Sequence, residues 1–320
     1  MDLKAYVLAA AAAALVGFGV NTRLNSIAAC PGAGYGADQY LAYCEAAGYG
    51  DYEHGALYLG LEPAAVDAMK RAEVLILGNS RTQRAFSSEA TAAFFRDLGT
   101  RFYTAGFGYA ENMTFAQALV EKHGLRPRAV VVNADPFFDA GVSWPARTLL
   151  RMENGPTIYE GKQRWQEAHR AVCGSAAGAW LCGETPAIFR SAVDGRWHLA
   201  GERRSRDLPI RPRDEERWLA QREILVERAE AFLGTLGVPR SCVVMTVVPS
   251  DDAPFETAKL VAEAVGVPFV TVEVPDLRTT DRSHLTGPSA ERWSGAFLEA
   301  VEDRLRSCLP ETGAAVAERH

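Results

Sequence analysis

The chain has 320 residues, of which 48% are hydrophobic and 23% charged, and its formal net charge is −6. This hydrophobic fraction is enough for a substantial folded core and excludes an intrinsically disordered chain. No long run of Lys and Arg occurs. An extended nucleic-acid-binding surface is therefore not expected, because phosphate contacts need clustered basic side chains.

The N-terminus has the pattern of an export segment. Lys4 precedes an apolar stretch of sixteen residues, Ala5 to Val20, which is short for a membrane-spanning helix and sufficient for a signal peptide. Ser26-Ile27-Ala28 resembles a cleavage site, so a cleaved signal and an uncleaved membrane anchor are equal alternatives for residues 1–28. A lipoprotein signal ending at Cys30 is a weaker alternative, and a buried helix is another. We expect export to the periplasm or the exterior.

The six cysteines fit an exported protein. The spacings of Cys30 and Cys44, and of Cys173 and Cys182, suit local disulfides in an oxidising compartment. Cys242 lies in an apolar strand pattern and is expected to be a buried thiol. No Cys-x-x-Cys pair is present and no His stands at metal-ligand spacing from a Cys, so no metal site is expected.

Strands and helices alternate after an N-terminal extension over residues 29–70. Short apolar, β-branched runs predict strands buried on both faces, at residues 74–77, 101–104, 129–133, 242–248 and 268–272. Helices are predicted at residues 62–71, 88–98, 110–123, 254–265 and 288–308. This alternation predicts a flavodoxin-like three-layer α/β sandwich over residues 71–310, with about five parallel strands and a short tail, 311–320.

Residues 137–241 interrupt the alternation after the third predicted strand. A structureless loop of this length is rare, so a mainly helical insertion is expected there. It would emerge at the sheet edge where α/β proteins bind ligands. The stretch holds five of the six tryptophans, which either fill a core or stack against a ligand: Trp144, Trp165, Trp180, Trp197 and Trp218.

Two short motifs suggest a catalytic triad. Gly78-Asn79-Ser80-Arg81 directly follows the first apolar run, and Asp281-Arg282-Ser283-His284 precedes the last predicted helix. A serine on a tight turn after a strand can be a nucleophile, with His284 as its base and Asp281 as the group that orients the base. The alternative is that Ser80 only caps the following helix and that His284 is structural.

The other histidines carry less information. His54, His123 and His320 have no supporting sequence context, whereas His169 and His198 lie in the predicted insertion and are candidate substrate contacts.

Four motifs together resemble the SGNH (GDSL-like) hydrolase superfamily. Besides the two above, Thr104-Ala105-Gly106-Phe107-Gly108 stands where the second block of that family supplies a glycine. Val132-Asn133-Ala134-Asp135 stands where the third block supplies an asparagine. The four occur in the family's order, each at the end of a predicted strand, across residues 71 to 308 apart from the insertion. The first block has Asn79 at the position where the GDSL motif that names the family has Asp.

The resemblance implies an oxyanion hole made by the backbone N–H groups of Ser80 and Gly106 and the side-chain amide of Asn133. Gly108 is the alternative glycine. The third block lacks its usual Gly and Asp neighbours of the asparagine, so Asp135 is expected to share the polar role of Asn133. Arg81 is expected to pair with Asp135 or to meet an anionic substrate.

The implied function is an exported serine esterase, without a cofactor, that removes O-acyl groups, chiefly acetyl, from a carbohydrate or polysaccharide. One alternative is an O-acetyltransferase of an envelope or secreted polysaccharide, which would use the same triad and receive its acyl group from a membrane partner. The other alternative is a non-catalytic glycan-binding or assembly protein on the same scaffold.

Overall fold

The computed structural model describes residues 27–46, 48–175, 178, 180–201 and 206–309. The predicted export segment lies outside the described residues except for its last two positions, and so does the predicted tail. Among the described helices, none combines the length and the apolar composition that crossing a membrane requires.

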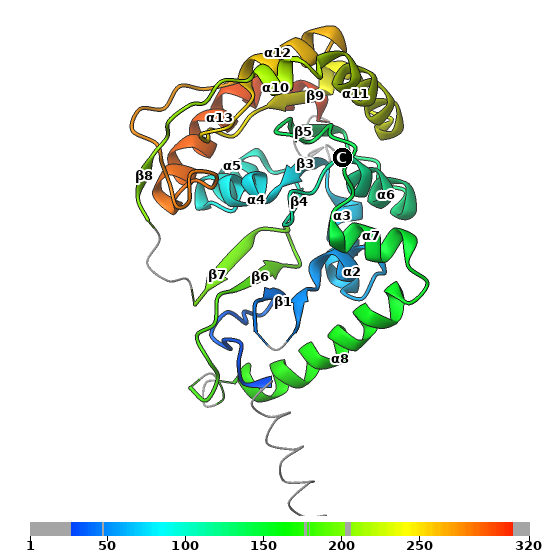
Figure 1. Ribbon diagram of the computed structural model, residues 1–320, viewed down its shortest axis with the longest axis vertical. Coiled ribbons are helices and arrows are strands. Elements are labelled where there is room, and N and C mark those ends of the chain that lie inside the picture. The colour runs from blue at the N-terminus through cyan, green and yellow to red at the C-terminus, as the bar shows by residue number, and fades with distance from the viewer. Residues whose placement is uncertain (1–26, 47, 176–177, 179, 202–205, 310–320) are drawn as a thin grey trace, which may run out of the picture.

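A parallel sheet forms the centre of the larger half of the molecule (Figure 1). Its strands run in the order β4-β3-β5-β9, and their bounds are β3 Val74–Asn79, β4 Phe102–Phe107, β5 Ala129–Asn133 and β9 Val243–Thr246. The expectation of about five strands is only partly met. The fifth predicted strand contributes a single parallel bridge between Phe269 and Met245, because its residues lie at the sheet edge and are only partly buried.

Both faces of this sheet are covered, which explains why its strands are apolar at consecutive positions. Alternate residues of β3 point to opposite faces: Val74 and Ile76 pack in one core cluster, Leu75 and Leu77 in the other. Helices α4 (Ser80–Phe86), α5 (Glu89–Leu98) and α13 (Gly287–Cys308) cover the first face. Helices α6 (Met113–His123), α11 (Arg222–Leu236) and α12 (Phe255–Ala264) cover the second. The core is therefore a three-layer α/β arrangement.

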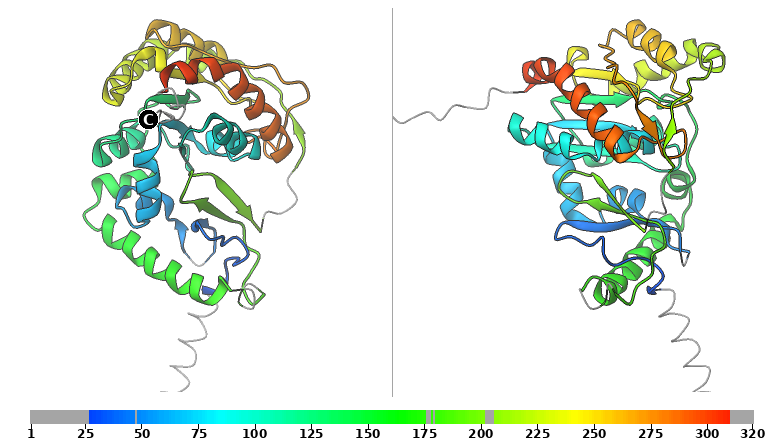
Figure 2. Two further views of the ribbon diagram at one scale, coloured as in Figure 1. Left: turned by 180° about the vertical axis from the view of Figure 1, so that it is seen from behind. Right: turned by 90° about the vertical axis from the view of Figure 1, so that its left-hand side faces the viewer.

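A second, antiparallel sheet packs beside the first (Figures 1 and 2). Its order is β2-β1-β6-β7, with β1 Gln39–Cys44, β2 Gly50–Asp51, β6 Ala187–Ser191 and β7 Trp197–Ala200. The N-terminal extension thus supplies β1 and β2, and the stretch predicted as a mainly helical insertion supplies β6, which pairs with β1, and β7, which pairs with β6. Sequence periodicity did not reveal this pairing, because β1 and β6 are far apart in the chain.

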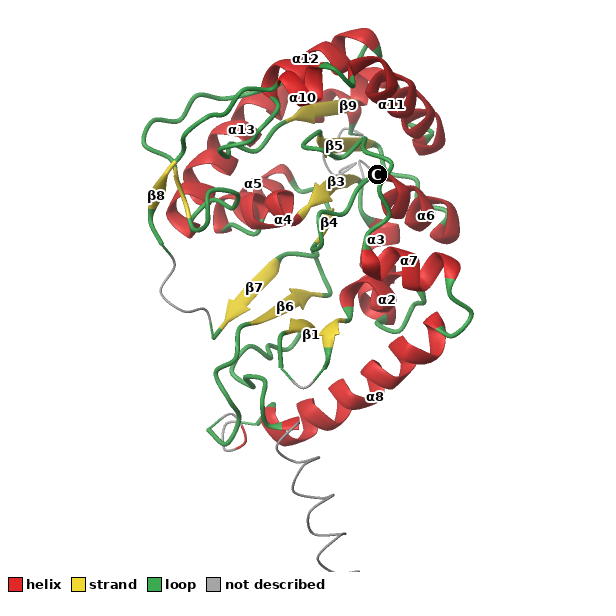
Figure 3. Cartoon of the chain, viewed as in Figure 1, coloured by secondary structure: helices red, strands yellow, loops and turns green. Residues whose placement is uncertain are grey.

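The remaining elements surround the two sheets (Figure 3). They are α2 Glu53–Tyr58, α3 Pro63–Arg71, α7 Trp144–Arg151, α8 Gly155–Cys173, β8 Leu208–Pro209, α10 Glu216–Leu219, the 3₁₀ turn η1 Arg240–Cys242, and β10 Arg278–Thr279. Strands β8 and β10 pair with each other, so the residues just before the Asp281–His284 motif are tied to Leu208 and Pro209, within the 137–241 stretch.

All six cysteines form disulfides. The pairs Cys30–Cys44 and Cys173–Cys182 match the spacings seen in the sequence. The prediction of a buried thiol at Cys242 was wrong: this residue lies in η1, just before β9, and bonds to Cys308 at the end of α13. Three disulfides indicate an oxidising, exported environment.

The Cys242–Cys308 disulfide is expected to stabilise the fold most, because it closes a loop of 66 residues whereas Cys173–Cys182 closes only 9. Chain-entropy scaling predicts that replacing both Cys242 and Cys308 by serine lowers the unfolding free energy by about 4 kcal/mol. The matched change at Cys173 and Cys182 should cost about 2.5 kcal/mol. Urea unfolding followed by circular dichroism measures both values, and equal losses would contradict the loop-length argument.

Candidate functional site

The end of β3 presents Ser80 as the first residue of α4. The side chain of Asn79, not that of Ser80, caps this helix by accepting a hydrogen bond from the backbone N–H of Arg81 at 2.9 Å. The Asn79 amide also donates to the carbonyl of Asp135, beyond the neighbouring strand β5. The alternative interpretation, that Ser80 only caps the helix, is therefore wrong, and the Ser80 hydroxyl is free to contact another side chain.

Ser80, His284 and Asp281 form one hydrogen-bonded chain. His284 Nε2 lies 2.8 Å from Ser80 Oγ, and His284 Nδ1 lies 2.7 Å from Asp281 Oδ2. The other carboxylate oxygen, Asp281 Oδ1, accepts the backbone N–H groups of Ser283 at 3.0 Å and of His284 at 2.8 Å. Both oxygens of Asp281 are thus committed to holding the imidazole in one orientation.

Electrostatics favour an ionised Asp281. Burial alone would raise the pKa of this carboxyl, but the hydrogen bonds and charge of His284 outweigh burial and lower the pKa well below its usual range. The chain of three remains open to solvent, since the side chain of Asp281 is 53% exposed and that of His284 is 22% exposed. The site can therefore receive a group attached to a large substrate.

Arg81 joins the motifs to one another. Its guanidinium forms an ion pair with Asp135 through Nη1 and with Asp252 Oδ1 through Nη2 at 2.6 Å, and Nε donates to Ser283 Oγ at 2.8 Å. The segments after β5 and β9 and the Asp281–His284 turn are thereby all held against the residue that follows Ser80. Of the two roles expected for Arg81, the structure shows the pairing with Asp135.

Asp135 is buried and supports Arg81. Burial raises the pKa of its carboxyl to about 6, against the opposing effect of Arg81. One of its oxygens is bonded to Arg81, and the other, Oδ1, is buried without a hydrogen-bond partner.

The side-chain amide nitrogen of Asn133, Nδ2, donates no hydrogen bond to another group of the protein. Asn133 ends β5 and is fully buried; its Oδ1 accepts the backbone N–H of Val248 at 3.0 Å, whereas its Nδ2 has no hydrogen-bond partner. Buried polar groups are rarely left unpaired, and a persistent exception calls for an explanation such as a ligand or a catalytic role.

The two candidate glycines differ in availability. Gly106 lies inside β4, and its N–H donates to Gln83 Oε1 at 3.2 Å, so the preference for Gly106 as an oxyanion donor is not supported by the geometry. The reason is that β4 continues to Phe107, beyond the predicted end at residue 104. The register pairs Asn79 with Phe107, so Ser80 and Gly108 leave the sheet next to each other. Gly108 N–H reaches only Glu53 Oε1, at a long 3.4 Å.

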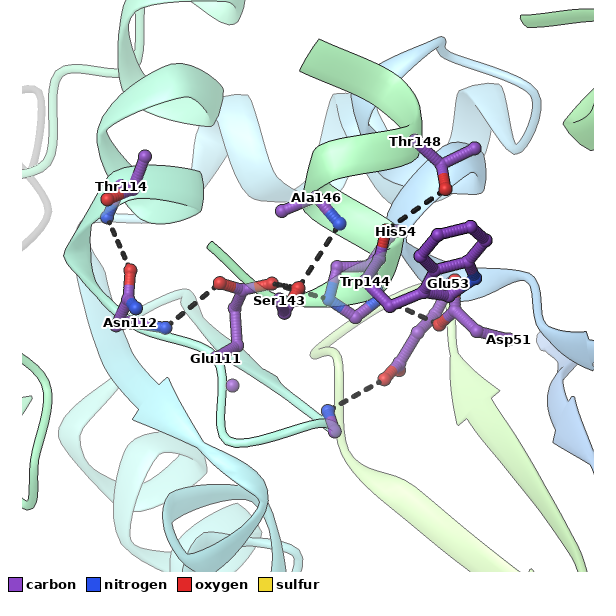
Figure 4. A network of polar contacts seen from close by, with 12 residues as sticks. Asp51, Glu53, His54, Glu111, Asn112, Thr114, Ser143, Trp144, Ala146 and Thr148 are labelled. Carbon is purple, nitrogen blue, oxygen red and sulfur yellow. Dashed lines mark hydrogen bonds and ion pairs between the residues drawn. The ribbon is translucent and has the colours of Figure 1, made fainter. Parts of the chain in front are cut away.

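A buried charged network beside β4 was missed in the sequence (Figure 4). His54 is fully buried, with Nδ1 at 2.6 Å from Asp51 Oδ1 and Nε2 at 3.0 Å from Glu111 Oε2. Asp51 and His54 have the same three-residue spacing as Asp281 and His284, which is the signal that could have drawn attention to them. The difference is that His54 faces a second carboxylate rather than a serine.

Glu53 and Arg190 extend this network towards the site. Arg190 of β6 is fully buried; it pairs with Glu53 Oε2 at 2.8 Å and donates to the carbonyls of Gly106 at 3.1 Å and Thr104 at 2.6 Å. Trp197 Nε1 also donates to Glu53, at 2.9 Å. Arg190 therefore attaches the antiparallel sheet to the edge of β4.

Three ligand atoms of this network, one each from Asp51, Glu53 and His54, lie within 4.8 Å of one another, which is the spacing of a metal centre. Both nitrogens of His54 are hydrogen-bonded to carboxylates, and Glu53 is paired with Arg190. A cation would have to displace these partners, so the residues are satisfied as an ionic network.

The protonation of His54 predicts a pH dependence of stability. Burial alone would lower the pKa of His54, but Asp51 and Glu111 raise it to about 10 from an ordinary 6.5. The folded state thus holds a proton that the unfolded state releases between these pH values. The stabilisation is complete below pH 6.5 and is lost as the pH rises towards 10. We expect the unfolding free energy to fall by several kcal/mol across this window.

Urea unfolding between pH 6 and 10 measures this slope, and a His54→Gln variant is the comparison. The variant is expected to lack most of the decline; equal slopes in the two proteins would show that His54 is neutral in the folded state.

Two other histidines lie away from the triad. His169 is buried between the Tyr35 hydroxyl at 2.8 Å and the Cys30 carbonyl at 3.0 Å, so its expected role as a substrate contact is replaced by a structural one. His198 lies in β7 opposite Phe189. Neither could be placed from the sequence, because α8 and β7 both lie in the stretch for which periodicity predicted only a mainly helical insertion.

A cavity of about 540 Å³ lies at the opposite end of β4 from Ser80. Its lining includes Arg71, Phe95, Arg101 and Asp194 and none of the triad residues. The triad lies away from this cavity, at the carboxyl ends of the strands.

Comparisons with models of known protein families, with curated proteins and with solved structures gave no match for this chain.

Proposed function

We propose that the protein is an exported serine esterase of SGNH type that removes O-acyl groups, chiefly acetyl, from a carbohydrate or polysaccharide. The observation that carries this proposal is the chain of hydrogen bonds from Ser80 through His284 to Asp281. A serine, an imidazole and a carboxylate in this order are the components of nucleophilic acyl transfer on unrelated folds.

The geometry supports a double-displacement mechanism. Ser80 Oγ attacks the ester carbonyl while His284 Nε2 takes the hydroxyl proton, and His284 then returns this proton to the leaving alcohol. Asp281 keeps the Nδ1–H tautomer and stabilises the imidazolium. Water, activated by the same histidine, releases the acyl group from Ser80. No cofactor takes part in these steps.

The developing oxyanion needs donors that the fold has not used. The unpaired Asn133 Nδ2 is one such group, and the weakly engaged N–H of Gly108 is another. We propose the backbone N–H of Ser80, at the start of α4, as the third donor. Losing one donor of this kind typically costs about 10²–10³-fold in rate.

A polymer-borne ester in the periplasm or outside the cell fits two features. The exposed triad admits a group attached to a large molecule, and the disulfides place the chain in an oxidising compartment. We propose that residues 1–28 act as a cleaved signal or as a membrane anchor.

The exposure of the triad also favours a second candidate, an O-acetyltransferase. An acyl-enzyme open to solvent can be resolved by a sugar hydroxyl as well as by water. Such an enzyme would receive its acyl group from a membrane partner. A non-catalytic glycan-binding protein is a weaker candidate, because a binding surface has no need of all three triad residues in hydrogen-bonding order.

A fluorophosphonate probe tests the nucleophile. It should label the wild-type protein and a Ser241→Ala control, and it should not label Ser80→Ala; an unlabelled wild type would refute the proposal. Acetate release from an acetylated glycan, compared with acetyl transfer to a glycan acceptor, then distinguishes the esterase from the transferase. Glycan binding without either activity would favour the binding protein.

A further inference from the structure

Two exposed aromatic side chains lie in the segments that follow the strands on either side of β3. Tyr109, after β4, is 47% exposed, and Trp144, which begins α7 after β5, is 63% exposed. Since β3 lies between β4 and β5, the two segments leave the sheet on either side of the strand that leads into Ser80; β5 ends at Asn133, and Trp144 follows at the start of α7. The register that places Gly108 next to Ser80 puts Tyr109 one residue further along the same edge.

The turn that carries Tyr109 has an unfavourable backbone. Tyr109 and Ala110 have φ angles of 61° and 50°, two consecutive residues with a Cβ in the left-handed region. Such conformations persist only where the surrounding structure holds them, and they gather at functional sites. Here the strained turn holds a half-exposed tyrosine at the edge of the candidate active site.

The buried network described above holds this turn. Glu111 is buried, pairs with His54 at 3.0 Å, and accepts the backbone N–H of Asn112 at 3.0 Å (Figure 4). The hydroxyl of Ser143, directly before Trp144, donates to the same carboxylate. The Asn112 side chain also donates to the carbonyl of Gly141. The turn that bears Tyr109 and the residues that lead into Trp144 are therefore cross-linked through one carboxylate and one amide.

We infer that Tyr109 and Trp144 form a subsite that binds a sugar ring of the acylated glycan, an inference that rests on the proposed function. Sugar rings have C–H faces that pack on aromatic rings and hydroxyls that need polar neighbours. Two separate aromatics beside a polar network suit such a ligand better than an apolar partner surface, which requires a continuous apolar patch. Behind them, the carboxylates of Asp51, Glu53 and Glu111 face His54 and Arg190, so no excess positive charge selects an anionic sugar.

The test uses a neutral acetylated oligosaccharide, partially O-acetylated cellohexaose, and a small ester without a sugar, p-nitrophenyl acetate. Tyr109→Ala and Trp144→Ala should each lower the ratio of kcat/KM for the oligosaccharide to kcat/KM for the small ester by about tenfold, the effect of losing one ring-stacking contact. Trp180→Ala is the matched control, because Trp180 is 84% exposed and lies beyond the end of α8; it should leave the ratio unchanged. Equal losses on both substrates, or an unchanged ratio, would overturn the inference.

A binding measurement separates this inference from the proposed function. Calorimetric titration of Ser80→Ala with the same oligosaccharide should detect binding, and adding Tyr109→Ala should weaken the affinity about tenfold. Tyr109-dependent binding by a protein whose wild type hydrolyses neither ester would support the subsite and refute the esterase. Hydrolysis of both esters, with binding that is absent or independent of Tyr109, would refute the subsite and leave the esterase standing.

Discussion

Replacing His284 by alanine is expected to reduce kcat for p-nitrophenyl acetate by roughly 10⁵-fold, because the Ser80 hydroxyl then has no base to take its proton. Asp281→Asn should lower kcat by roughly 10⁴-fold with little change in KM, since the amide cannot hold the Nδ1–H tautomer. Steady-state kinetics measure both effects, with circular dichroism to show that each variant is folded.

His123→Gln is the control for the loss of a histidine. His123 ends α6 and its Nε2 bonds to the carbonyl of Leu57, on the opposite side of the fold from the triad residues of α4 and the last motif, so this variant should keep wild-type kinetics. If His284→Ala retained a rate within about tenfold of wild type, where general-base catalysis alone contributes about 10²-fold or more, the catalytic assignment would be wrong.

A loss of stability comparable to that from removing the Cys242–Cys308 disulfide is expected from Glu53→Leu. This change leaves the guanidinium of Arg190 buried without its carboxylate, and breaking a buried ion pair from one side typically costs about 3–5 kcal/mol. Chemical denaturation should show this loss as a lower midpoint. Because Arg190 joins the antiparallel sheet to β4, the variant should also become more susceptible to proteolysis between α8 and β7.

The double variant Glu53→Leu/Arg190→Met distinguishes destabilisation by an unpaired buried charge from destabilisation by lost packing. Replacing both members of a buried pair with apolar residues is often close to neutral, so the double variant should recover much of the stability. If the double variant were as unstable as the sum of the two single changes, the coupling energy would be zero, and the two side chains would stabilise the fold independently instead of as an ion pair.

The first and last motifs could be located from the sequence because their geometry is local. Asp281 and His284 lie three residues apart, so one turn brings the carboxylate and the imidazole together. Ser80 follows an apolar run that is buried on both faces, and the ends of parallel strands meet at one sheet edge. The alternation of strands and helices that creates this edge was also readable, because hydrophobic periodicity is a property of neighbouring residues.

The donors of the candidate oxyanion hole could not be identified from hydrophobic periodicity, because they depend on where strands end and on which side chains contact them. The choice between Gly106 and Gly108 turns on where β4 ends and on a side chain, Gln83, that comes from another element. The capping of α4 by Asn79, which frees Ser80, depends likewise on the loop around Asp135. Strand ends and side-chain partners are decided by contacts between elements, not by local propensity.

By itself, the sequence determined the α/β layering, the order of the motifs and two of the three disulfide spacings, since each depends on residues close together in the chain. Only the tertiary structure decided that Cys242 bonds to Cys308, that β6 and β7 form a sheet with the N-terminal strands, and that His54 is enclosed by two carboxylates. The physical reason is the same for all three. Strand pairs, disulfides and buried ion pairs between distant segments form only when the fold of the whole chain brings those segments together. A local sequence pattern does not indicate which distant segment a residue will contact.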